Sequence, residues 1–259
     1  MKQSSIAFIG GGRITNIFLR GFKRAGITFG SVSVFDPSTQ SLEKLAADFP
    51  LISVEQASPE LVAGQDIVVL AVHPPVLTET LQKIKPALKS GSLVISLAPK
   101  ITLEKISGVL GPAQAAARVN PGAAGIINKG INPVSFNAAC TSLQREYATS
   151  LLSSLGQVRL VDEKKMEAYA VISAMGPTYF WFQLQVLKDL ALEFGLAEAE
   201  AREVISVMMA GAVETLFASG MEPEAVMNLV PVKPLGEHEE MIRQLYRERL
   251  TAVFEKIKP

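Results

Sequence analysis

The chain has 259 residues, of which 48% are hydrophobic and 19% charged, a composition that suits one or two globular domains and excludes wholesale disorder. Its 25 Lys and Arg balance its 25 Asp and Glu, so no net field attracts nucleic acid or an anionic membrane, and no apolar run approaches the roughly 20 residues of a membrane span. One cysteine and two histidines allow no internal disulfide and show no zinc-ligand spacing, which predicts a cytoplasmic protein without a metal site.

Short apolar runs alternate with amphipathic segments through roughly the first 160 residues. The runs are continuous, as in strands covered on both faces, and lie at 6–9, 32–35, 66–72, 93–97, 115–119 and 158–161. Between them, apolar residues at helical spacing predict helices within 14–25, 42–46 and 76–88. This alternation predicts a doubly wound parallel sheet with right-handed crossovers.

The rest of the chain has helix signals and almost no strand signals. Prolines and glycines delimit helices at 177–194, 198–219, 223–229 and 237–257. We therefore predict an α/β protein with a Rossmann domain over residues 1–162 and an all-helical domain over residues 163–259. The many apolar positions of these helices indicate a face buried against another subunit, so we expect a homodimer or a higher homo-oligomer.

The first chemical motif is Gly10-Gly-Gly-Arg-Ile-Thr15, directly after a predicted strand and at the start of a helix. It fits the dinucleotide fingerprint G-x-G-x-x-G at Gly10 and Gly12 and departs from it at Thr15. The first glycine makes the tight turn, and the second lets the backbone approach the pyrophosphate at the helix N-terminus. The residues predicted to bind NAD or NADP here are Gly10, Gly12, Arg13 and Ile14. A glycine turn with a purely structural role is the alternative.

Asp36 follows the second predicted strand and is the candidate ligand of the adenosine ribose. An acid at this place binds the ribose 2′-hydroxyl and repels a 2′-phosphate, and no cation follows until Lys44, which favours NAD over NADP. Ser38, Thr39 and Arg13 are the groups that would hold a phosphate instead. A turn aspartate before proline is the structural alternative.

Two more loops follow predicted strands, at the edge where doubly wound sheets bind ligands. The first loop is predicted to line the cofactor with Ala71, Val72, His73 and Pro74. His73 is either a hydrogen-bond donor to the cofactor or an exposed loop residue. The second loop brings Asn120 towards the expected nicotinamide, where its amide offers a donor and an acceptor to a carboxamide or a substrate. A plain turn is the alternative for Asn120.

Together these motifs resemble the pyrroline-5-carboxylate reductase family over nearly the whole chain. The segment 8–14 resembles the family's glycine loop, and Leu70-Ala-Val-His-Pro74 resembles its Ala-Val-Lys-Pro loop. Further similar segments are 94–98, 101–103, 118–121, 161–166 and 173–179. The resemblance implies a two-domain subunit whose helical domain interleaves with a second subunit. It also implies that a nicotinamide cofactor reduces a cyclic imine carbon of a small substrate.

The departures from the family fall where the resemblance places the substrate. The second serine of the family's Ser-Gly-Ser-Gly-Pro motif is Met175 here. The family's Pro-Gly-Gly-Thr-Thr segment, which holds the substrate carboxylate and assists proton transfer, aligns with Lys233-Pro-Leu-Gly-Glu237. Glu237 would repel a carboxylate unless Lys233 or His238 compensates. We therefore expect a substrate other than pyrroline-5-carboxylate.

The predicted catalytic residues follow from the need for a proton donor. Histidine titrates near neutral pH, which favours His238, and Tyr179 and Thr178 offer hydroxyl groups. Lys233, which would balance the charge of Glu237, completes the set. The structural alternatives are a solvated histidine at the start of a charged helix and a tyrosine in an apolar core.

Two other function classes stay open. A dinucleotide-binding sensor or scaffold without catalysis is favoured by the missing threonines and by Met175. A reductase that exchanges hydride between NADP and a deazaflavin has the same fold, although Asp36 argues mildly against NADP.

Overall fold

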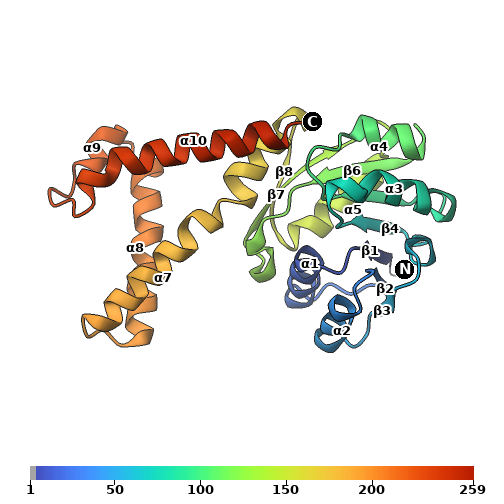
Figure 1. Ribbon diagram of the computed structural model, residues 1–259, viewed down its shortest axis with the longest axis horizontal. Coiled ribbons are helices and arrows are strands. Elements are labelled where there is room, and N and C mark those ends of the chain that lie inside the picture. Colours follow the sequence, from blue (N-terminus) through green and yellow to red (C-terminus); the bar gives the residue numbers. More distant parts are fainter. Residues whose placement is uncertain (1–3) are drawn as a thin grey trace. The chain divides into compact units, whose positions relative to one another are not determined.

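The computed structural model describes residues 4–259, which form two compact units (Figure 1). The first unit extends to Met175 and also includes Val253–Pro259, and the second is Gly176–Ala252. The structure groups residues 163–175 with the first unit, and the predicted domain boundary after residue 162 stays a prediction. The reason for this grouping is that residues 163–175 are fixed on the sheet of the first unit by hydrogen bonds and ion pairs.

The first unit is built on an eight-stranded sheet in the order β3-β2-β1-β4-β5-β6-β7-β8. The strands are β1 (Ser5–Ile9), β2 (Ser31–Phe35), β3 (Ser53–Glu55), β4 (Ile67–Leu70), β5 (Leu93–Ser96), β6 (Ala115–Val119), β7 (Gly130–Phe136) and β8 (Gly156–Leu160). The strands from β3 to β6 are all parallel, which confirms the predicted Rossmann sheet. β7 runs antiparallel to β6 and parallel to β8, and neither β3 nor β7 was predicted.

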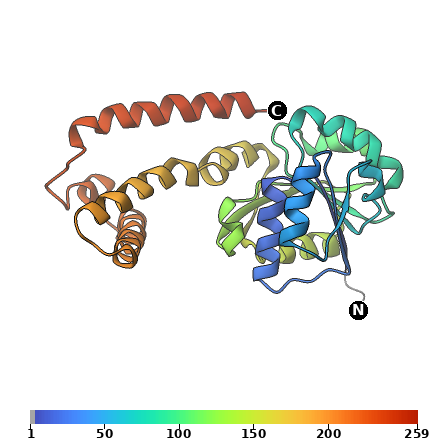
Figure 2. The same cartoon turned by 60° about the horizontal axis from the view of Figure 1, so that its bottom comes forward.

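Helices cover both faces of this sheet (Figure 2). On one face lie α1 (Arg13–Arg24), α2 (Thr39–Asp48) and α5 (Ser142–Ser153), and on the other lie α3 (Pro74–Ile84) and α4 (Leu103–Leu110). Successive residues of β1 alternate between the two cores, because neighbouring strand residues point to opposite faces. Ile6 and Phe8 pack on the α1 side, whereas Ala7 and Ile9 pack on the α3 side. Burial of each such large side chain stabilises the fold by about 1.5–3 kcal/mol.

Residues after β8 return to the sheet before the chain enters the second unit. A short helix, α6 (Met166–Tyr169), continues into a π-helical turn at Ala170–Ala174. The turn closes with the amide of Met175, which donates to the carbonyl of Ala170 at 2.9 Å. This wide turn lies directly before the boundary between the units.

The second unit is helical, as predicted. It contains α7 (Pro177–Glu193), α8 (Glu198–Ala218), α9 (Pro223–Met227) and most of α10 (Glu239–Ile257). Within these four helices Ala201 is the only buried residue, and many large apolar side chains are exposed. No helix within residues 4–259 is long and apolar enough to cross a membrane.

Candidate functional site

The glycine loop joins the carboxyl end of β1 to α1. Gly10 has a φ of +108°, which L-residues rarely adopt, and a Cβ there would lie 2.5 Å from the carbonyl oxygen of Ala71. Gly12 is the N-cap of α1, and a Cβ added to it would meet no described atom within 4 Å. The turn itself therefore requires Gly10, whereas Gly12 keeps open the approach to the first amides of α1. Those amides have no acceptor within the helix and suit a phosphate.

Thr15 occupies the third position of the fingerprint, where glycine or alanine is usual. Its side chain is completely buried, and its hydroxyl donates a hydrogen bond to the carbonyl of Gly10. A buried hydroxyl without a partner would be costly, so this bond explains how threonine is accommodated here. The hydrogen bond of Thr15 thus links the first turn of α1 to the glycine turn that precedes it.

Asp36 links the end of β2 to the glycine loop. One carboxylate oxygen accepts the amide of Gly11 at 2.7 Å, and the other accepts the amide of Ser38 at 2.8 Å. On the outer side of the turn, the side-chain amide of Gln56 donates to the hydroxyl of Thr39 at 2.7 Å. The turn therefore holds a carboxylate in a fixed position beside the glycine loop. Asp36 is a turn residue, and it also stands at the predicted ribose position.

The loop after β4 continues this edge of the sheet. The amide of Ala71 donates to the carbonyl of Ile9 at 2.8 Å, so the loop begins in contact with the end of β1. His73 is exposed and is the N-cap of α3, and Pro74 is the first residue of that helix, where no amide donor is needed. The structure thus brings the predicted residues of three loops together at the carboxyl ends of β1, β2 and β4. That they contact a dinucleotide stays a prediction.

Asn120 has surroundings that differ from those predicted. It follows β6 at the same edge, but it is 6% exposed, and its side-chain amide donates to the carbonyl of Met166 at 2.5 Å. Its backbone amide donates to the carbonyl of Pro133 at 3.2 Å. The side chain therefore uses one N–H of its amide to hold the chain at Met166, and its contact with a carboxamide or a substrate stays a prediction.

A buried charged cluster next to Asn120 was missed by the sequence reasoning. Arg118 is 1% exposed, and its two terminal nitrogens lie 2.9 Å from Glu163 Oε1 and 2.7 Å from Glu167 Oε1. The same oxygen of Glu163 accepts the amide of Leu103, the first residue of α4, at 2.7 Å. The signal for this cluster was an arginine within an apolar strand, together with two glutamates at the i, i+4 spacing of one helix face.

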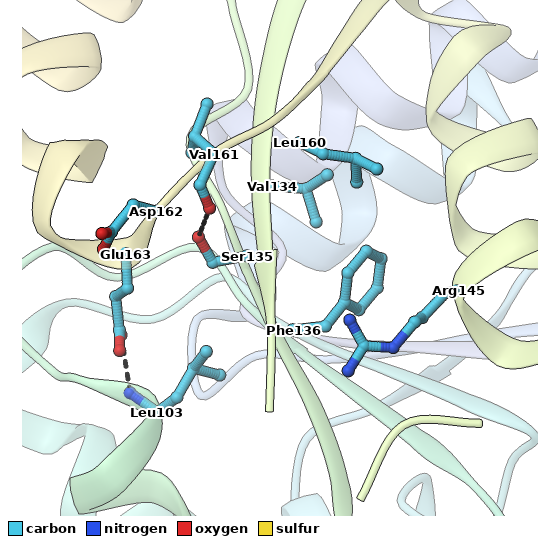
Figure 3. A pocket seen from close by; sticks show the side chains of 9 residues that line it. All are labelled: Leu103, Val134, Ser135, Phe136, Arg145, Leu160, Val161, Asp162 and Glu163. Carbon is cyan, nitrogen blue, oxygen red and sulfur yellow. Dashed lines mark hydrogen bonds between the residues drawn. The ribbon is translucent and has the colours of Figure 1, made fainter. Parts of the chain in front are cut away.

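A pocket of about 340 Å³ opens on the first unit and is shown in Figure 3. Its lining residues are Leu103, Val134, Ser135, Phe136, Arg145, Leu160, Val161, Asp162 and Glu163. The hydroxyl of Ser135 donates to the carbonyl of Val161 at 2.6 Å, and the Arg145 guanidinium lies 5.2 Å from the centre of the Phe136 ring. None of the predicted site residues lines this pocket.

The predicted catalytic residues all lie in the second unit. Its apolar groove, about 1370 Å³, is lined by residues of α7, α9, α10 and the chain between 230 and 236. Lys233 lines this groove and donates to Asn228 Oδ1 at 3.0 Å. The ring of Tyr179 packs edge-on against Tyr246, a groove residue, with 5.9 Å between ring centres. Burial, and to a lesser extent Tyr246, raise the pKa of Tyr179, so its hydroxyl keeps its proton.

The other two catalytic candidates lie outside the set of groove-lining residues. His238 ends the 3-10 turn Gly236–His238 and is exposed, with Nε2 3.8 Å from Glu237 Oε1. Thr178 is exposed in the first turn of α7. Within the second unit, the structure therefore places Lys233 and Tyr179 at or beside the groove, and it does not gather all four residues in one place.

Two family models match this chain. Residues 5–100 match the model described as NADP oxidoreductase, coenzyme F420-dependent. Residues 163–257 match the model described as pyrroline-5-carboxylate reductase dimerisation. The first match spans the glycine loop, Asp36 and the loop after β4, and the second spans the helices of the second unit.

Relatives match over nearly the full length. The pyrroline-5-carboxylate reductase of Pseudomonas aeruginosa is 29% identical over 99% of this chain and 93% of its own. Pyrroline-5-carboxylate reductase 2 of Bacillus subtilis is 28% identical over 95% and 88%. The solved structure of Plasmodium falciparum pyrroline carboxylate reductase with NADP bound has a TM-score of 0.79 at 22% identity, covering 99% of this chain and 96% of that one. At that identity, the structural likeness concerns the fold.

Proposed function

Because the chain belongs to the pyrroline-5-carboxylate reductase family, we propose that it is an NAD(P)H-dependent reductase that acts on the C=N or C=O bond of a small substrate. The observation that carries the proposal is the glycine loop at the carboxyl edge of the sheet. There the approach to Gly12 is open, and the free amides of a helix start lie beside it. Full-length similarity to curated reductases supports the same assignment.

The residues that would hold the cofactor lie in three neighbouring loops. The backbone of Gly12, Arg13 and Ile14 would hold the pyrophosphate, and Asp36 would accept the ribose hydroxyls. Ala71 to Pro74 would line the part of the cofactor that crosses β4. When bound, the nicotinamide supplies the hydride. The protein contributes position, charge and a proton.

Asp36 makes NADH the preferred cofactor in this proposal. Its carboxylate is fixed by the amides of Gly11 and Ser38, so it cannot turn away without losing two hydrogen bonds. A 2′-phosphate would meet this charge at close range, whereas a 2′-hydroxyl would donate to it. Arg13, the first residue of α1, is the cation that would favour NADPH instead.

The proton donor is proposed to come from the second unit. Tyr179 is positioned by its contact with Tyr246, and its hydroxyl can donate a hydrogen bond, while burial raises its pKa and makes it a weaker acid. Lys233 is suited to offset the negative charge of Glu237 near a substrate carboxylate. His238 and Thr178 are the remaining donor candidates. We further propose that the helices of the second unit form a homodimer or a higher homo-oligomer, and that the enzyme acts in the cytoplasm, where the lone thiol of Cys140 stays reduced.

The test is calorimetric titration with NADH and NADPH, followed by a cofactor-oxidation assay with two cyclic imines. Pyrroline-5-carboxylate and 1-pyrroline have the same ring, and only the first carries a carboxylate. Turnover of either compound supports the proposal, and faster turnover of 1-pyrroline supports the expected change of substrate. Cofactor binding without turnover of any imine or ketone would favour a sensor or scaffold. Turnover only with an added deazaflavin would favour the reductase class of the model that matches residues 5–100.

A further inference from the structure

We propose that Arg118, Glu163 and Glu167, here called the Arg118 cluster, are positioning residues that fix the point where the chain leaves the cofactor-binding unit. The proposal rests on the proposed function, because its effect on catalysis is measured on the proposed reductase activity. It concerns side chains that neither contact the glycine loop nor belong to the predicted catalytic set.

Several attachments converge on the start of the segment 163–175. Arg118, in β6, holds Glu163 and Glu167 through separate guanidinium nitrogens at 2.9 and 2.7 Å. Two residues further along the chain, Asn120 holds the carbonyl of Met166 at 2.5 Å. Glu163 also accepts the first amide of α4 at 2.7 Å. Two side chains at the end of β6 and the start of α4 therefore hold three residues of this segment, Glu163, Met166 and Glu167.

Stability alone does not account for a charged group in this place. Arg118 and Glu167 are buried, with 1% and 4% of their side chains exposed, and Arg118 Nε has no hydrogen-bond partner among the described residues. Desolvation of a buried ion pair costs about as much as the pair regains, and apolar side chains of similar size often stabilise a protein equally well. The ion pairs add a fixed direction, since a guanidinium donates to its two carboxylates from a rigid, planar set of N–H groups.

The fixed segment leads directly to the boundary between the units. After α6, the backbone widens into the π-helical turn Ala170–Ala174, a rare form that is frequent at functional sites. The first unit ends at Met175, one residue beyond this turn. Because β6 also ends at the cofactor edge, the Arg118 cluster ties the exit of the chain to the same strand that borders the predicted nicotinamide.

The experiment compares two variants with one control. Glu167→Gln keeps the shape and an acceptor oxygen but removes a charge, leaving the buried Arg118 with one charged partner. The double variant Arg118→Met/Glu167→Leu replaces the buried pair with apolar side chains of similar size, and we expect it to unfold at a temperature close to that of the wild type. Glu146→Gln, an exposed glutamate on α5, is the control. The measurements are hydrogen exchange of amides 163–175, the Kd for the cofactor, and kcat and KM with the better imine.

We expect amides 163–175 to exchange faster in both cluster variants, and the Kd for the cofactor to stay unchanged. We expect kcat to fall by about tenfold to a hundredfold, the loss that a small misplacement of reacting groups produces. The control should match the wild type throughout. Unchanged exchange in both cluster variants would overturn the proposal, and so would a stable double variant with the kcat of the wild type, which would show a purely structural role. If the wild type reduces no substrate, the proposed function fails, while hydrogen exchange still decides whether the cluster fixes the segment.

Discussion

Gly10 and Gly12 are glycines for different physical reasons, and this difference can be measured. The positive φ of Gly10 and its close approach to Ala71 make any side chain strained there, whereas Gly12 has an ordinary φ and open space. We expect Gly12→Val to keep the unfolding temperature of the wild type and to weaken cofactor binding by about a hundredfold, or about 2.7 kcal/mol. Calorimetric titration and thermal unfolding test both parts. Gly10→Ala should instead lower the unfolding temperature, and cofactor affinity unchanged in Gly12→Val would place the cofactor elsewhere.

The charge of Asp36 is proposed to decide between the two cofactors. Asp36→Asn keeps an acceptor oxygen for the turn, but it removes the repulsion of a 2′-phosphate. We expect the ratio of NADPH to NADH affinity to rise by about tenfold, mainly through tighter NADPH binding. Titration of both cofactors measures this ratio, with unfolding temperature as the check on folding. An unchanged ratio would leave Asp36 as a turn residue only.

Asp66 makes the first unit sensitive to acid. The ammonium group of Lys89 and the amide and hydroxyl of Ser5, both at 2.9 Å, lower the pKa of Asp66 from 3.8 to about 2. The folded state therefore favours the carboxylate, so its stabilising effect is present above about pH 4 and is lost as the pH falls towards about 2.

We expect Asp66→Asn to be less stable than the wild type at neutral pH, and the difference in unfolding free energy to shrink as the pH drops from about 4 to about 2. Urea unfolding at several pH values measures it. Because Asp66 is partly exposed, high salt should reduce the difference as well. A difference that stays constant with pH would assign the loss to the hydrogen bonds of Ser5 rather than to the charge.

At the scale of elements, the sequence predicts the strands that have a continuous apolar run and the helices that have apolar residues at helical spacing. Such a run marks β4 and its neighbours. Two helices of the second unit, α7 and α9, begin at a proline, and a glycine or proline lies two residues beyond the ends of α8 and α10. No continuous apolar run marks β7. This strand starts at a glycine and contains Pro133, and proline normally argues against a strand inside a sheet. β3 has three residues at the sheet edge and is too short to leave a pattern.

α1 packs closely on the segments that flank β7, and the spacing of apolar residues in the sequence does not predict this close contact. A Cβ on Gly21, within α1, would lie 2.5 Å from the carbonyl oxygen of Gly125 and 2.5 Å from Leu155 Cδ2. We expect Gly21→Ala to lower the unfolding free energy by about 1–3 kcal/mol, because overpacking outweighs the better helix propensity of alanine. Gly108→Ala, in α4 with open space around it, should instead raise it by about 0.5–1 kcal/mol. Chemical denaturation compares the two, and equal effects would show that helix propensity alone governs both sites.

At the scale of the whole molecule, the positions of the predicted cofactor-binding loops could be predicted from the sequence, whereas the arrangement of the predicted catalytic residues could not. The glycine loop, Asp36 and the loop after β4 are each set by local rules that apply to any doubly wound sheet. A proton donor is chosen by three-dimensional surroundings, and Tyr179 and His238, which looked alike as candidates, have different ones. Tyr179 is packed against another ring, whereas His238 is exposed beside a carboxylate.

The apolar groove of the second unit gives the last prediction, which concerns assembly. A protomer that leaves this groove open exposes many large apolar side chains to water, a pattern typical of a subunit interface. Leu187 lines the groove on α7, and we expect Leu187→Arg to raise the dissociation constant of the oligomer by about a hundredfold, because an unpaired charge would be buried on association. Sedimentation equilibrium over a range of concentrations measures the constant, with Glu193→Lys, a charge change on α7 outside the groove-lining set, as the control. A wild type that is monomeric at all concentrations would contradict the proposed assembly, whereas an oligomer unaffected by Leu187→Arg would place its interface on another face of the helices.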